Sequence, residues 1–244
     1  MELLKNERKI KMDGACIKRI YFFAILLLQL IAYPIAIFNI GEYNDWVYYG
    51  IILSCFITAA VFVEKNVQSF LQIGAAFFTC VADYCLILGK ASHVVGVSFF
   101  LVVQIFYAAR TLFLTESKKE RIVNLSVRFE ASVLATLAVF LVFGEETEAL
   151  FVVSLIYYVN LLTNIAFAFL HFKENKLLPI GLVLFALCDT VLGLDEVIGI
   201  FSISHESLFY KLLHPPFALE AAFYCPSQVI LSISGKSAKN INTL

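Results

Sequence analysis

The chain has 244 residues, of which 61% are hydrophobic and only 15% are charged, and its formal net charge is −1 at pH 7. A soluble globular domain is typically about 45–50% apolar, so this composition excludes an ordinary soluble protein. Several separate apolar runs approach the roughly 20 residues that a helix needs to cross a bilayer, and the sequence therefore predicts an all-α, polytopic membrane protein.

Eight transmembrane helices are expected, in a single domain over residues 20–234. They lie near 20–38, 46–63, 69–89, 93–115, 122–143, 149–170, 177–194 and 217–234. A basic tail over residues 1–19 precedes this domain, and a short polar tail over 235–244 follows it. The longest connection, Asp195–Pro216, has an apolar middle that is too short to span, so we expect it at the membrane interface or folded over the surface.

Lysine and arginine are distributed unevenly over the two sides of this topology. With the amino terminus in the cytoplasm, that side receives fourteen of them and the opposite side receives two. The positive-inside rule therefore places both termini in the cytoplasm. Arg110 and Arg128 fall inside spans near the cytoplasmic face, and we expect them to snorkel to it. A bacterial cytoplasmic membrane and a eukaryotic endomembrane both fit this pattern.

Two aspartates lie inside apolar runs, Asp83 in FFTCVADYCLIL and Asp189 in VLFALCDTVLGL. An ionised residue at the centre of a spanning helix costs about 2.5–3.5 kcal/mol on insertion scales, so such residues usually face a protein interior or a wet cavity. Both spans run outward, and each acid lies roughly 8–9 Å below the expected outer end at 1.5 Å per residue. Equal depth allows the two acids to meet. The likeness of the two runs is also what a repeat of four plus four helices would produce.

A pair of acids in one site supports general acid–base chemistry. Two carboxyl groups in a low-dielectric site cannot both ionise easily, so one would keep its proton beside a carboxylate. That arrangement can act on water or on a weakly basic substrate. The alternative is that each acid pairs with a different polar partner and only fixes helix packing.

Further polar residues recur at helical spacing on the fourth and eighth spans. These are Gln104 and Tyr107 on the fourth, and Glu220, Tyr224 and Gln228 on the eighth. They would either line the cavity of the acids and bind a polar headgroup, or join helices by hydrogen bonds worth about 1 kcal/mol or less each. The six cysteines show no spacing typical of a metal site, and neither a metal nor a cofactor is expected.

The third and fourth spans, with FFTCVADYCLIL followed by VVQIFYAAR, resemble the YhhN-like lysoplasmalogenase family. That family combines an acid-bearing helix with a helix that has Gln or His three residues before Tyr. LVLFALCDTVLGL and AAFYCPSQVILSIS resemble its second acid motif and its final Tyr/Gln helix. Ala82 and Cys188 stand where the family usually has Gly or Ser, and Pro226 interrupts the last motif.

The resemblance implies an integral-membrane hydrolase that cleaves the vinyl ether bond of lysoplasmalogens to a fatty aldehyde and a glycerophospho-alcohol. It implies Asp83 and Asp189 as catalytic acids, with Gln104, Tyr107, Tyr224 and Gln228 lining the site. The expected partners are a lysophospholipid-type substrate and membrane lipids, and no nucleic acid. Two other functions remain open, a proton-coupled transporter of a small amphiphile and a non-catalytic lipid-binding protein.

Overall fold

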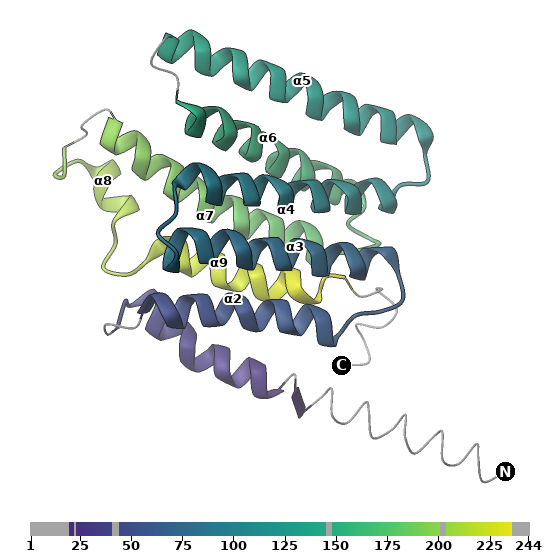
Figure 1. Ribbon diagram of the computed structural model, residues 1–244, viewed down its shortest axis with the longest axis horizontal. Helices are drawn as coiled ribbons and strands as arrows, with labels where there is room; N and C mark the ends of the chain where they lie inside the picture. Colours follow the sequence, from purple (N-terminus) through teal and green to yellow (C-terminus); the bar gives the residue numbers. More distant parts are fainter. Residues whose placement is uncertain (1–19, 22, 41–43, 145–147, 201–203, 236–244) are drawn as a thin grey trace.

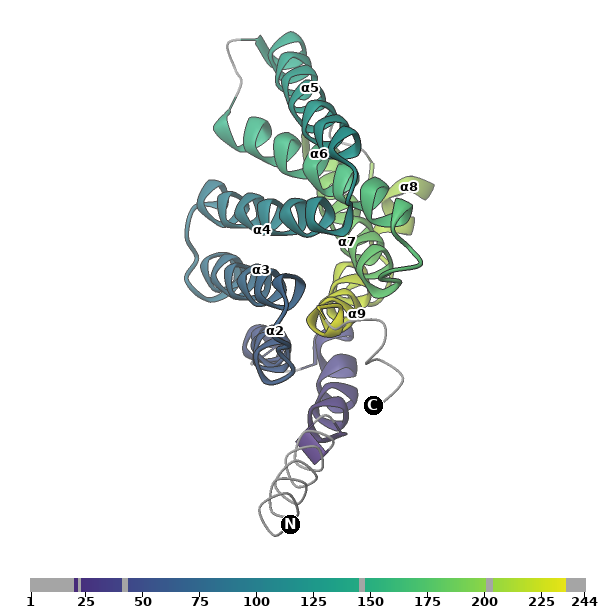
Figure 2. The ribbon, with the colours of Figure 1, turned by 90° about the vertical axis from the view of Figure 1, so that its right-hand side faces the viewer.

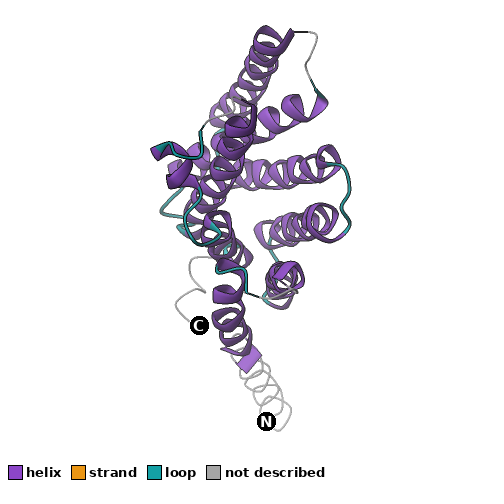
Figure 3. Cartoon of the chain, turned by 90° about the vertical axis from the view of Figure 1, so that its left-hand side faces the viewer, coloured by secondary structure: helices purple, strands orange, loops and turns teal. Residues whose placement is uncertain are grey.

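The computed structural model describes residues 20–21, 23–40, 44–144, 148–200 and 204–235. All regular structure in these ranges is helical (Figure 3). The helices are Phe23–Ile37, α2 (Asn44–Val61), α3 (Val67–Asp83), the π-helical turn η1 (Tyr84–Leu88), α4 (His93–Leu114), α5 (Lys118–Phe143), α6 (Ala149–Leu170), α7 (Leu177–Ile200), α8 (Leu208–Leu213) and α9 (Leu219–Ile233) (Figure 1).

Six of these segments are long and apolar enough to cross a membrane, namely α2, α3 with η1, α4, α5, α6 and α7. The protein is therefore a multi-pass membrane protein. The first helix, Phe23–Ile37, and α9 are apolar but shorter, and they coincide with the first and eighth spans expected from the sequence. The count of eight spans and the cytoplasmic placement of the termini stay predictions. The two tails, apart from Gly235, lie outside the described residues.

Two helix boundaries differ from the expected ones by four residues or more. Helix α5 begins at Lys118 rather than near residue 122, because Ser117 caps it by accepting a hydrogen bond of 3.3 Å from the Glu120 amide. Helix α7 continues to Ile200, and the stretch 195–200 that it adds contains no helix-breaking proline. Part of the connection expected at the interface is therefore helical. Asp189 consequently lies about 16 Å from the end of its helix, not 8–9 Å.

Six helices close into a ring. Contacts run from α2 to α3, α3 to α4, α4 to α6, α6 to α7, α7 to α9 and back from α9 to α2, and α3 also touches α9 across the ring. Figure 2 looks nearly along the helices and shows α2, α3 and α4 on one side, with α7 and α9 opposite them. Helix α5 packs outside the ring on α6. The first helix lies outside it at the other end, against α2, to which Gln29 donates a hydrogen bond of 2.9 Å at Ser54.

The order of contacts is the same in both halves of the chain. Exchanging α2, α3 and α4 with α6, α7 and α9 maps the six contacts around the ring onto one another, although not the additional contact of α3 with α9. The first helix, which bonds to α2, and α5, which packs on α6, then occupy equivalent outer places. This is the arrangement that a repeat of four plus four helices predicts. The interior of the ring is filled by fully buried side chains from both halves, among them Val103, Leu161, Leu182 and Leu231.

The expectation that Arg110 and Arg128 snorkel to the membrane surface is wrong. Arg110 is 0% exposed and donates to Gln68, to Gln72, and to both the hydroxyl and the carbonyl of Ser234, the last two at 3.0 and 2.9 Å. Arg128 is 7% exposed and donates to side-chain oxygens of the asparagines on α5 and α6. A guanidinium carries five donors, and both arginines direct theirs to neutral acceptors inside the bundle.

Candidate functional site

Asp83 is held by a tyrosine from the far end of the chain. It is the last residue of α3, and the Tyr224 hydroxyl on α9 donates to its Oδ2 at 2.7 Å. Both side chains are buried, with exposed fractions of 4% and 2%. Directly after Asp83 the helix widens into the π-helical turn η1, a feature often found at functional sites. The acid therefore lies at a structural irregularity and not in a uniform helix.

Asp189 is also held by a tyrosine, but from the neighbouring helix. The Tyr157 hydroxyl on α6 donates to its Oδ2 in a short hydrogen bond. One residue further along both helices, the hydroxyl groups of Tyr158 and Thr190 lie 2.6 Å apart. Asp189 is partly exposed, whereas Tyr157 is buried. Two adjacent side-chain hydrogen bonds thus fix α6 against α7 at the level of the acid.

Aromatic rings connect the two acid–tyrosine pairs. The Phe100 ring centroid lies 6.0 Å from that of Tyr157 and 6.5 Å from that of Tyr224. Phe185 lies 5.4 Å from Tyr224, and Tyr48 stacks on Tyr224 at 5.8 Å with an interplanar angle of 5°. Each of the six ring helices therefore contributes a side chain, either a ring of this aromatic cluster or an acid. The result is an apolar interior that contains two hydrogen-bonded carboxyl groups.

The acids are close enough to act on one another electrostatically. The electrostatic environment of Asp83 includes Asp189, and that of the Tyr157 hydroxyl includes both acids. The electrostatic environment of the Cys188 thiol includes the carboxyl groups of Asp189, Glu220 and Asp83, together with Cys225. Like charges grouped in an apolar interior are costly, so such a cluster favours a state in which at least one carboxyl group keeps its proton. Within the described residues, no group of three or more His, Cys, Asp or Glu is arranged to hold a metal ion.

Two further residues predicted for the site lie on α9 on either side of Tyr224. Glu220, one turn before it, is partly buried and interacts electrostatically with Cys188 and with Tyr48. Gln228, one turn after it, is buried and donates at 3.3 Å to the Ser227 hydroxyl. Glu220 therefore belongs to the acid cluster, whereas the hydrogen bond of Gln228 is to its own neighbour in the chain.

Gln104 and Tyr107 are fully buried on α4, beyond the aromatic cluster. The Gln104 side-chain oxygen accepts a hydrogen bond of 2.9 Å from Asn164, the same residue that accepts from Arg128. The Arg110 guanidinium lies 5.9 Å from the centroid of the Tyr107 ring. These two residues thus belong to the arginine end of the ring interior. Among the described residues, the Gln104 amide nitrogen has no hydrogen-bond partner although it is buried.

The sequence analysis missed Tyr157, Tyr48, Phe100 and Phe185. One signal was available for the tyrosines, because Tyr157 and Tyr158 stand well inside α6. Tyrosines of membrane helices gather at the two interfaces, so a tyrosine pair at depth indicates a hydrogen-bonding partner inside the protein. The phenylalanines carried no comparable signal in a chain that has 24 of them.

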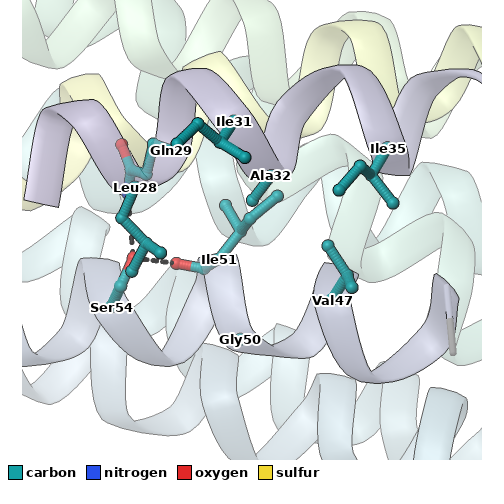
Figure 4. A pocket seen from close by; sticks show the side chains of 9 residues that line it. All are labelled: Leu28, Gln29, Ile31, Ala32, Ile35, Val47, Gly50, Ile51 and Ser54. Atoms are coloured by element: carbon teal, nitrogen blue, oxygen red, sulfur yellow. Dashed lines mark hydrogen bonds between the residues drawn. The ribbon is translucent and has the colours of Figure 1, made fainter.

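An apolar groove lies between the first helix and α2, away from the acids. It has a volume of about 300 Å³ and is lined by Leu28, Gln29, Ile31, Ala32, Ile35, Val47, Gly50, Ile51 and Ser54 (Figure 4). Gln29 and Ser54, which hydrogen-bond to each other, mark its polar end. Ile51 packs with Cys225 and Tyr48 on its inner side, so these side chains lie between the groove and the ring interior.

Of the comparisons with known proteins, the one with family models found a match. The model of the YhhN family matches residues 18–212. The matched range holds four of the predicted site residues and ends before α9, which carries the other three. No curated protein and no solved structure matches the chain.

Proposed function

This chain belongs to the YhhN family, the family of lysoplasmalogenases, and from that premise we propose that it is an integral-membrane hydrolase of the vinyl ether bond of lysoplasmalogen-type lipids. The products are a fatty aldehyde and a glycerophospho-alcohol. The observation that supports the proposal best is the pair of acids, each held by a tyrosine, in one aromatic interior. Such a site offers a proton donor and a carboxylate in apolar surroundings.

The chemistry begins with proton transfer to carbon. The protonated acid gives its hydrogen to the vinyl carbon next to the chain, a C–H bond forms from the π electrons, and an oxocarbenium ion results. The other carboxylate stabilises this cation. It then removes a proton from water as the water oxygen bonds to the cationic carbon, and a hemiacetal forms.

The second half of the cycle restores both acids. The acid that took its proton from water passes it to the glycerol oxygen as the C–O bond breaks. The carboxylate left by the first step removes the proton of the hemiacetal hydroxyl, and the aldehyde forms. One water is consumed, and both carboxyl groups return to their starting protonation states. Gln104, Tyr107, Glu220 and Gln228 are proposed to bind the polar part of the substrate.

The test is an assay of aldehyde release by the purified protein in liposomes that contain a lysoplasmenyl lipid. The matched control substrate is the saturated alkyl ether, which has no double bond to protonate and should not react. Asp83→Asn and Asp189→Asn are each expected to lower kcat at least about 100-fold, the usual contribution of a general acid or base. Asp45→Asn, the same change at an exposed residue of α2, should keep full activity.

Other outcomes would assign another function. Full activity of both aspartate variants would overturn the acid–base proposal. Uptake of the lipid driven by a proton gradient, with no aldehyde formed, would instead identify a transporter that uses the acids as a relay. Saturable binding with neither turnover nor uptake would indicate a lipid-binding protein.

A further inference from the structure

The two halves of the chain make the same hydrogen bond at one end of the ring. On α3 the Gln68 side chain donates at 2.9 Å to the carbonyl of Arg110, near the end of α4. Just before α7, the Asn175 side chain donates at 2.7 Å to the carbonyl of Ser234, at the end of α9. Gln68 and Asn175 are therefore equivalent positions of the repeat.

A close approach of helices follows six residues later in each half. A Cβ added at Gly74 would lie 2.3 Å from the Phe106 ring on α4, and one added at Gly181 would lie 2.6 Å from Leu231 on α9. In both halves, a glycine thus lets the acid-bearing helix pack tightly on the next helix of the ring. The register of α3 and α7 is therefore the same from the amide to the glycine.

The register then changes before the acids. Asp83 follows Gly74 by nine residues, whereas Asp189 follows Gly181 by eight. One residue turns a side chain by about 100° around a helix of 3.6 residues per turn. The two acids therefore occupy different register positions, and their partners differ as well, since Asp189 bonds to Tyr157 of its own half and Asp83 bonds across the ring to Tyr224.

A second difference concerns the tyrosine itself. Phe100 and Tyr224 both stand four residues before a glutamine, Gln104 and Gln228, on the equivalent helices α4 and α9. Only the second half therefore has a hydroxyl at this position. That hydroxyl is the one that holds Asp83.

The two acids also differ in how far their side chains are enclosed. Asp83 is 4% exposed, and its partner Tyr224 is enclosed by the rings of Tyr48, Phe100 and Phe185. Asp189 is partly exposed. A charge is costlier in the more enclosed place, which favours the neutral form of the carboxyl group at Asp83.

We infer that the two acids have fixed and different roles, with Asp83 the general acid and Asp189 the general base, and with Tyr224 and Tyr157 as positioning residues. The assignment rests on the proposed hydrolysis. The Tyr224 hydroxyl fixes Oδ2 of Asp83, so the transferable proton is on Oδ1. Asp83 gives this proton to the vinyl carbon, and Asp189 removes a proton from the attacking water. When the hemiacetal breaks down, Asp189 returns its proton to the glycerol oxygen and Asp83 recovers one from the hemiacetal hydroxyl.

Infrared spectra of the unliganded protein test the assignment without any need for turnover. The carbonyl stretch of a protonated carboxyl group at neutral pH should be lost in Asp83→Asn and retained in Asp189→Asn. Loss of the band in Asp189→Asn, or its persistence in both variants, would overturn the assignment. Because no substrate is present, this outcome does not depend on whether the protein hydrolyses a vinyl ether.

The pH dependence of kcat/KM tests the two tyrosines. Each tyrosine donates a hydrogen bond that favours the charged form of its acid, so its loss makes that acid harder to ionise. The acidic limb of the profile reports the ionisation of Asp189, and Tyr157→Phe should move it to higher pH by about one to two units. The alkaline limb reports the ionisation of Asp83, and Tyr224→Phe should move that limb to higher pH by a similar amount. Tyr158→Phe, which loses only the contact with Thr190, should move neither limb. The assigned roles would be overturned if neither limb moved, or if Tyr157→Phe moved the alkaline limb and Tyr224→Phe the acidic one. If the wild-type protein released no aldehyde, only the proposed function would be overturned.

Discussion

Tyr224 and Asp83 are separated by 141 residues of chain, yet their side chains hydrogen-bond at 2.7 Å inside the ring. This contact joins α9 to α3, and it is made by a helix that lies outside the range matched by the family model. The C-terminal helix is therefore part of the environment of the first acid.

We expect Tyr224→Phe to lower the free energy of unfolding by about 1–3 kcal/mol, because a buried carboxyl group loses a hydrogen-bond partner. Thermal unfolding in detergent measures the effect. Tyr84→Phe is the matched control, since the Tyr84 side chain is 53% exposed and should tolerate the loss of its hydroxyl. If Tyr224→Phe and Tyr84→Phe were equally stable, the hydrogen bond between Tyr224 and Asp83 would not contribute to the stability of the protein.

Arg110→Lys should destabilise the protein by about 2 kcal/mol or more. An ammonium group cannot reproduce the planar fork that serves Gln68, Gln72 and Ser234 at once, and it leaves buried acceptors unpaired. Arg121→Lys, at an exposed position, is the control. A denaturation curve of Arg110→Lys that matches the wild type would show that Arg110 does not join α3, α4 and α9.

Gly74→Ala should cost about 1–3 kcal/mol, because its new methyl group would meet the Phe106 ring, which is itself stacked on Phe78 at 5.6 Å. Gly50→Ala meets nothing within 4 Å on α2 and should be neutral or stabilising by up to about 1 kcal/mol. The melting temperatures of the two variants provide the comparison. If Gly74→Ala melted at the same temperature as Gly50→Ala, the close approach of α3 to α4 would not contribute to stability.

Gln104→Leu is expected to raise KM for a lysoplasmenyl lipid several-fold with little change in kcat, as the loss of uniform substrate binding does. The reason is the Gln104 amide nitrogen, which is buried and without a partner among the described residues and so can receive a polar group of the substrate. Steady-state kinetics at several lipid concentrations measure KM and kcat separately. Asn160→Leu, which alters a polar residue on the outer contact between α5 and α6, should leave KM unchanged.

Much of the fold could be read from the sequence because apolar runs of spanning length have few alternatives to a helix. The end of α7 could not, because the residues after position 194 suit a helix and an interfacial loop equally well by composition. The spacing of charges likewise could not show where Arg110 would lie. Its acceptors come from positions 38 to 124 residues away, and only the packed helices bring them together.

The acids of the site were found because a carboxyl group inside an apolar run is conspicuous. Their partners were harder to identify. Tyr224 was singled out by its spacing to Gln228, but Tyr157 was missed, since a tyrosine is ordinary in a membrane helix until its depth is considered. The spacing from glycine to acid, nine residues from Gly74 to Asp83 and eight from Gly181 to Asp189, could be compared only once contacts showed which positions of the two halves are equivalent.

The ring of two matched halves also bears on how such a protein can arise. An ancestor with four helices could have formed the same ring as a dimer of two identical copies. Because one gene would encode both copies, every substitution near the aspartate of one copy would also be present near the aspartate of the other. Once both copies were joined in a single polypeptide, each could diverge on its own. A phenylalanine on α4 and a tyrosine at the equivalent place on α9 are the kind of specialisation that a dimer of identical subunits cannot acquire.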